Sequence, residues 1–136
     1  MTRYCYSDCT EIEYTLWRNA INAAIRGKRG QAFLREMLRA FDNLPKKELI
    51  VGDMINEYGG VCALGAVFQK RGIDTQYIDI EMPEEVAKSL GIAKALVAEI
   101  TFLNDDCATY QWDADSPEQR FIRMRKWVKS QIKQSK

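Results

Sequence analysis

The stretch "IRGKRGQAFLRE", residues 25–36, places two glycines around two cations directly before an apolar helical pattern. The first turn of a helix offers free N–H groups and partial positive charge, so this turn could hold a phosphate, with Arg26, Lys28 and Arg29 adding charge. The stretch lacks the spacing of a phosphate-binding P-loop, and no apolar strand precedes it. We therefore favour a corner between two helices, with Gly27 as the C-cap of the first.

A second candidate is "FLNDD", residues 102–106, at the expected end of an apolar helix. Asn104, Asp105 and Asp106 could bind a metal such as Mg²⁺ or act as acid and base. Carboxylates at a helix C-terminus are disfavoured by the helix dipole, which indicates a counter-charge, for example from the basic last helix. A structural turn or ion pair is the interpretation that we favour, with a binding or catalytic role as the alternative.

The last helix carries seven Lys and Arg and no acidic residue between positions 119 and 136. We expect Arg120, Arg123 and Lys126 on its outward faces, where they could contact phosphates, an acidic protein surface or the acidic centre of this same chain. A solvated face is the commonest fate of such residues. These three cations complete the predicted binding set.

Four cysteines, Cys5, Cys9, Cys62 and Cys107, are expected to be reduced in a cytosolic chain. The spacing of the first two could supply half of a zinc site, but we expect no metal. Cys62 follows two glycines and could begin a helix, which would lower its pKa and favour a nucleophile. A small buried hydrophobe is the interpretation that we favour.

The chain has no histidine, so it contains neither a Ser-His-Asp nor a Cys-His catalytic couple. An enzyme built on this sequence would depend on carboxylates, a lysine or a cysteine activated in another way. We expect no catalytic residues and no cofactor.

Net charge is +1, but the charges are segregated along the chain. Residues 1–52 hold nine basic and six acidic residues, and residues 53–118 hold four basic and thirteen acidic ones. The acidic middle weakens the case for a general DNA-binding protein, because no basic field covers the whole domain.

The apolar periodicity and the capping signals predict a mainly α domain of five or six helices with a minor two-stranded β-ribbon. In the first helix one apolar stripe is expected to face the core, formed by Ile12, Leu16, Trp17, Ala20, Ile21, Ala24 and Ile25. The expected helices are 11–25, 31–43, 61–72, 83–91, 92–106 and 116–133, and the ribbon would pair 48–51 with 54–58 across Gly52 and Asp53.

One domain over residues 1–136 is expected, with an irregular segment at 1–10 and a frayed tail at 134–136. No apolar run reaches the length of a membrane span, and the N-terminus lacks the apolar region of a secretory signal. These features predict a cytoplasmic protein without a membrane partner.

The blocks "AIRGKRGQAFLRE", "VCALGAV", "LGIAKALVAEI", "ND" and "SPEQRF-x2-R-x-W" together resemble a family of small, largely uncharacterised proteins encoded by bacteriophages and prophages. The resemblance spans roughly residues 12–130 and carries no catalytic motif. It implies an accessory protein working inside a bacterial cell. Small phage proteins often bind and disable host machinery, including CRISPR and other defence systems.

The function expected from these observations is non-enzymatic binding to a host protein or protein complex, which would inhibit a defence system by occluding a protein surface. The alternative is a nucleic-acid or nucleotide-binding protein that uses the 27–30 turn and the basic last helix. A small carboxylate-dependent enzyme using Asp105 and Asp106 is the third possibility. The sequence makes no prediction of the oligomeric state.

Overall fold

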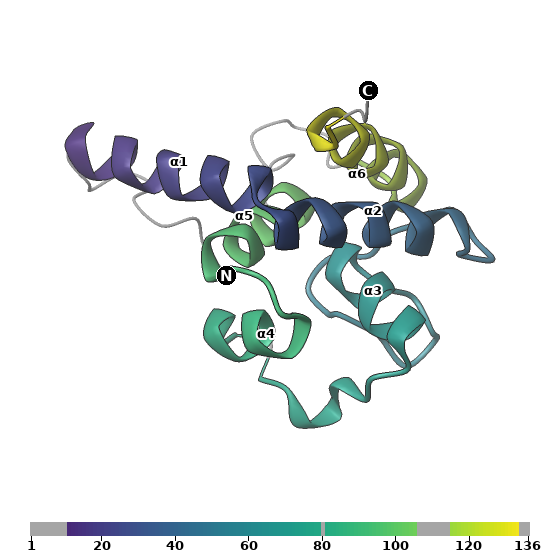
Figure 1. Ribbon diagram of the computed structural model, residues 1–136. Coiled ribbons are helices and arrows are strands. Elements are labelled where there is room, and N and C mark those ends of the chain that lie inside the picture. The colour runs from purple at the N-terminus through teal and green to yellow at the C-terminus, as the bar shows by residue number, and fades with distance from the viewer. Residues whose placement is uncertain (1–10, 80, 106–114, 134–136) are drawn as a thin grey trace.

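The computed structural model describes residues 11–79, 81–105 and 115–133, and within these ranges the fold is mainly helical (Figure 1). The prediction of a mainly α domain is confirmed. Six α-helices and one short 3-10 helix follow one another along the chain: α1 (Glu11–Arg26), α2 (Lys28–Asp42), α3 (Ala63–Arg71), η1 (Thr75–Tyr77), α4 (Pro83–Leu90), α5 (Lys94–Asp105) and α6 (Pro117–Gln131). None of these helices has an apolar stretch long enough to cross a membrane.

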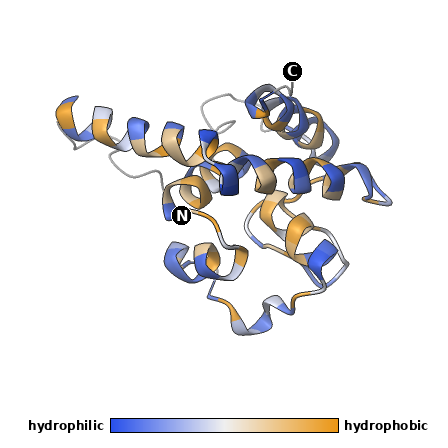
Figure 2. Ribbon diagram, viewed as in Figure 1, coloured by the Kyte–Doolittle hydropathy of each residue, from blue (hydrophilic) through white to orange (hydrophobic). Residues whose placement is uncertain are grey.

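The α2 helix crosses the middle of the molecule, with α6 on one side and α3 on the other (Figure 1). The α5 helix packs against both α1 and α4. Apolar faces of these helices turn toward one another and form one continuous core (Figure 2). Its largest fully buried side chains are Phe41, Phe68, Ile21, Leu34, Met37, Leu49, Leu96, Ile100 and Met124.

The ends of several helices follow the sequence signals. Ser116 caps α6 by accepting a hydrogen bond from the Gln119 backbone, and the Gln119 side chain accepts one from the Ser116 backbone. This reciprocal capping box satisfies two free donors of the first turn. Gly72 and Gly91 end α3 and α4 in the left-handed conformation, which glycine adopts without strain.

The connection between α1 and α2 is shorter than the sequence indicated, because α2 begins at Lys28 rather than near residue 31. Gly27 is the N-cap of α2, with an ordinary φ of −68°. Gly30 lies inside α2, and a Cβ atom there would meet the Ala24 carbonyl oxygen at 1.8 Å. The contact between the two helix backbones therefore requires the second glycine of the stretch, not the first.

The predicted β-ribbon is wrong. The 54–56 segment turns back onto 60–62 and makes a single antiparallel bridge, between Ile55 and Val61. The Asn56 side chain fixes this turn by accepting hydrogen bonds from the backbones of Tyr58 and Gly60. In the 48–51 segment, the backbone N–H groups of Leu49 and Ile50 donate to the carbonyls of Pro117 and Val61. This segment therefore does not pair with 54–58.

The apolar stripe predicted for α1 is only half correct. Trp17, Ile21 and Ile25 are buried, whereas Ile12 and Leu16 are exposed. Arg18 holds the inward face on α5 through an ion pair of 2.6 Å with the buried Glu99, and its guanidinium lies 5.5 Å from the Trp17 ring centre. The α1 helix therefore has a second apolar face that points away from the core.

Candidate functional site

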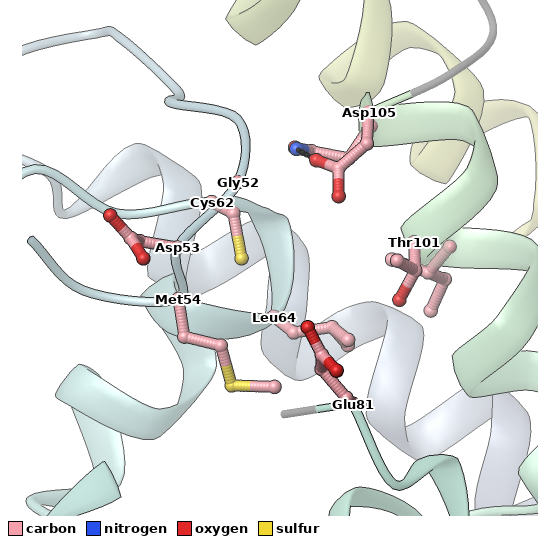
Figure 3. A pocket seen from close by; sticks show the side chains of 10 residues that line it. Gly52, Asp53, Met54, Cys62, Leu64, Glu81, Thr101 and Asp105 are labelled. Atoms are coloured by element: carbon pink, nitrogen blue, oxygen red, sulfur yellow. Dashed lines mark hydrogen bonds between the residues drawn. The ribbon is translucent and has the colours of Figure 1, made fainter. Parts of the chain in front are cut away.

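A small pocket of about 130 Å³ lies between the start of α3, the end of α5 and two loops. We call it the acidic pocket, because three carboxylates and no cation line it. Its lining residues are Gly52, Asp53, Met54, Cys62, Leu64, Glu81, Ile100, Thr101, Asn104 and Asp105. In Figure 3 the side chains of Thr101 and Asp105 on α5 and of Glu81 before α4 extend toward the same space, with the Cys62 thiol beside it.

Asn104 holds the walls of the acidic pocket together. Its buried side chain accepts a hydrogen bond from the Ala63 N–H at the start of α3 and donates to the Ile50 carbonyl and the Asp105 carboxylate. A buried amide with these partners stabilises the junction of α3, α5 and the 48–51 segment. Of the predicted "NDD" set, Asn104 and Asp105 both line the pocket, with the Asn104 side chain bonded to its walls, and Asp106 lies outside the described residues.

Cys62 is a buried thiol and the N-cap of α3. Its Sγ atom accepts a hydrogen bond from the Gly65 N–H. Burial, and to a smaller extent the nearby Asp105 charge, raise the pKa of the thiol to about 11 against the opposing effect of that hydrogen bond. At neutral pH the group is protonated, so the position at a helix start does not produce a nucleophilic thiolate.

The small residues around Cys62 serve close packing. A Cβ atom at Gly65 would meet the Met54 carbonyl oxygen at 1.9 Å. The segment that lies against Gly65 is the 52–56 loop. This contact forms one wall of the acidic pocket.

Arg120 and Arg123, predicted on the outward faces of the last helix, are turned inward. Arg120 is only 6% exposed, donates to the Leu49 carbonyl, and forms an ion pair of 3.0 Å with Asp115. Arg123 pairs with the same carboxylate at 2.6 Å and donates to the Leu103 carbonyl at the end of α5. The predicted counter-charge at that helix end is therefore Arg123, which contacts a backbone carbonyl.

Lys126 is exposed on α6 and lines a wide open groove of about 700 Å³. We call this feature the α6 groove. Arg125 pairs with Asp42 in it, and the Lys47 ammonium donates to carbonyls at the end of α2. The groove is lined by Asp42, Lys47, Phe121, Ile122, Arg125, Lys126, Lys129 and Ser130.

The remaining predicted cations, Arg26, Lys28 and Arg29, are exposed at the corner between α1 and α2. Among the described residues, no carboxylate forms an ion pair with any of them. The segment that follows α6 reaches this corner, since the Lys133 ammonium donates to the Arg26 carbonyl at 3.1 Å. Buried Gln31 ties the same three segments together by donating to the Ile25 and Gln131 carbonyls.

The structure thus divides the predicted binding residues among the acidic pocket, the internal arginine pair, the α6 groove and the helix corner. The predicted binding set left out Ile122, Arg125 and Lys129, which also line the groove. From Ile122, steps of three and four residues lead through Arg125 or Lys126 to Lys129, which places these residues on one helix face and could have revealed the groove. The predicted binding set also left out Asp53 and Glu81, which only the folding of distant loops brings to the pocket.

Within the described residues, no group of three or more Cys, Asp or Glu side chains is arranged to hold a metal ion. The suggested half-site at Cys5 and Cys9, like Cys107, lies outside these residues. No protein-family model, curated protein or solved structure matches this chain.

Proposed function

We propose that this chain is a binding protein that docks an acidic, partly apolar segment of another protein in the α6 groove. The observation that supports this most directly is the pairing of charge with an exposed apolar side chain. Ile122 is 65% exposed within the groove, next to Arg125, Lys126 and Lys129. Partner carboxylates can pair with the lysines while an apolar side chain covers Ile122.

Two features of the groove favour a protein over a nucleic acid. Lys126 and Lys129 have no ion-pair partner among the described residues, but Asp42 places a carboxylate in the same groove. That carboxylate gives the groove charges of both signs, whereas a phosphate backbone carries only negative charge, and the exposed Ile122 gains nothing from a phosphate backbone. A mixed apolar and charged surface is characteristic of protein interfaces.

We further propose that the partner is a host protein in the bacterial cytoplasm and that occluding its surface inhibits a defence system such as CRISPR. This step rests only on the resemblance to small phage and prophage proteins. Inhibition by occlusion requires no catalytic group, and the thiol of Cys62 is protonated at neutral pH.

Affinity capture from a bacterial host lysate, followed by mass spectrometry, tests the proposal. Lys126→Glu with Lys129→Glu should abolish capture of the partner. The matched control is Lys70→Glu with Lys88→Glu, which makes the same change in net charge at two exposed lysines that do not line the groove. Equal capture by both double variants would refute the groove as the docking site.

Phosphate or nucleic-acid binding at the helix corner is the second candidate, because Lys133 joins Arg26, Lys28 and Arg29 there. In that case Lys28→Ala with Arg29→Ala should weaken nucleic-acid binding and reduce its salt dependence by roughly one unit of slope per lost phosphate contact. Unchanged binding and slope would exclude the corner.

A further inference from the structure

The outward face of α1 is apolar along much of its length. Ile12 is 73% exposed and Leu16 is 63% exposed, and the exposed Ala20 and Ala23 continue the same face. At 3.6 residues per turn, these four residues lie within about 80° of one another, away from the buried Ile21. The N-terminal half of α1 extends beyond the other helices, so this face is accessible (Figure 1).

Large and small side chains are segregated along this face. Ile12 and Leu16 lie in the N-terminal half, and Ala20 and Ala23 lie in the C-terminal half. The centres of the two pairs are about 11 Å apart at a rise of 1.5 Å per residue. A second α1 helix running antiparallel would therefore place its large pair over the small pair, and the same contact would repeat across a twofold axis.

The charges at the two ends of the face have opposite signs. Glu11 and Glu13 lie in the first turn of α1, whereas Arg26 lies in its last turn and Lys28 begins α2. Antiparallel pairing brings each acidic end next to the partner's basic end. Parallel pairing would bring like charges and like ends of the helix dipoles together.

We propose that the outward faces of α1 pair antiparallel and join two copies of this chain in a twofold symmetric dimer. A self-complementary surface of this kind closes on itself and needs no other component. The contact involves only one helix per copy, so the surface area that it buries is small compared with the roughly 1,200–2,000 Å² buried in a stable interface. The dimer is therefore weak and concentration-dependent, and it does not depend on the α6 groove.

Sedimentation velocity of the full chain, over roughly a hundredfold range of concentration, measures this equilibrium. The mass should rise from that of the 15.7 kDa monomer toward twice that value. Leu16→Glu should weaken dimerisation at least about tenfold, because it places a charge in the apolar contact. Ile122→Glu is the matched control, since Ile122 is equally exposed but lies on α6, and it should leave the dimer intact.

Charge reversal tests the orientation. Glu11→Lys with Glu13→Lys, and separately Arg26→Glu with Lys28→Glu, should each weaken self-association, and a mixture of the two variants should form a heterodimer. Salt should weaken the wild-type dimer, because the antiparallel contact pairs opposite charges. A monomer at every concentration, association that strengthens with salt, or equal effects of Leu16→Glu and Ile122→Glu would each overturn the proposal.

Discussion

The two sides of α6 carry the same kind of charge but use it differently. On the inward side, Arg120 and Arg123 share Asp115 and bond to carbonyls of distant segments. On the outward side, Lys126 and Lys129 face an open groove beside Ile122. Cations only three residues apart are therefore structural in one case and available for recognition in the other.

The difference shows why a basic helix is weak evidence for a basic binding surface. The guanidinium of Arg120 is compensated by one carboxylate and two backbone carbonyls, which makes its burial tolerable. A lysine ammonium offers no comparable planar set of donors, and the two lysines remain on the solvent side. The inward arginines should govern stability, and the outward lysines should govern binding.

The largest effect is expected from Arg120→Met. Removing this side chain leaves the Leu49 carbonyl without its partner and weakens compensation of Asp115, at a cost of about 3 kcal/mol. Urea unfolding measures the loss, and Arg120→Lys should recover only part of it. Lys126→Met, the outward counterpart, should change stability by less than about 0.5 kcal/mol. Equal losses from the two methionine variants would remove the distinction between the two sides.

A smaller loss, of about 1–2 kcal/mol, is expected from Arg123→Met. This variant removes the bonds to Asp115 and the Leu103 carbonyl, but the side chain is half-buried, so water can replace part of what is lost. The same urea titration tests the ranking. A loss greater than that of Arg120→Met would contradict the burial argument.

The outward lysines should affect kinetics more than stability. With the partner captured from the lysate, Lys129→Ala should slow association about tenfold at low salt and have little effect at high salt, because steering by exposed charge is screened. Stopped-flow measurements at two salt concentrations give the comparison. A change confined to dissociation would instead place Lys129 in a desolvated contact.

The smallest effect concerns the exposed pair at the edge of the groove. The hydrogen bond from Arg125 lowers the pKa of Asp42 below its ordinary value of 3.8. The pair therefore stabilises the fold above that value, and this contribution disappears as the pH falls through the lower folded pKa. Asp42 is 48% exposed, so the contribution of the pair is small. Between about pH 5 and pH 3, the fall in the free energy of unfolding should be greater in wild type than in Asp42→Asn, by less than about 0.5 kcal/mol.

Glu36 provides the internal reference for that titration. It pairs with Arg71 at 2.6 Å, its side chain is 19% exposed, and the hydrogen bond from Arg71 lowers its pKa. Glu36→Gln should therefore reduce the acid-induced loss of stability by more than Asp42→Asn does. Urea unfolding at the same pH values measures both losses. The reverse order would show that exposure does not set the strength of these pairs.

All six helices could be predicted from the sequence, because periodicity, caps and helix-ending glycines act over a few residues. The capping box at Ser116 and Gln119 is an example, since both partners lie within one turn. The candidate site was less predictable. Lys126 is outward as expected, but the acidic pocket combines Asp53, Glu81 and Asp105 from three distant segments.

What the sequence by itself determined is therefore local: which segments form helices and where most of them begin and end. Only the tertiary structure decided which side of a helix meets the core, because that depends on distant groups that exclude or replace water. Arg120 is inward because Leu49 and Asp115 supply acceptors, and Gly30 is required because the Ala24 carbonyl lies against it. Leu16 stays exposed because no described segment covers the outer face of α1 at that position.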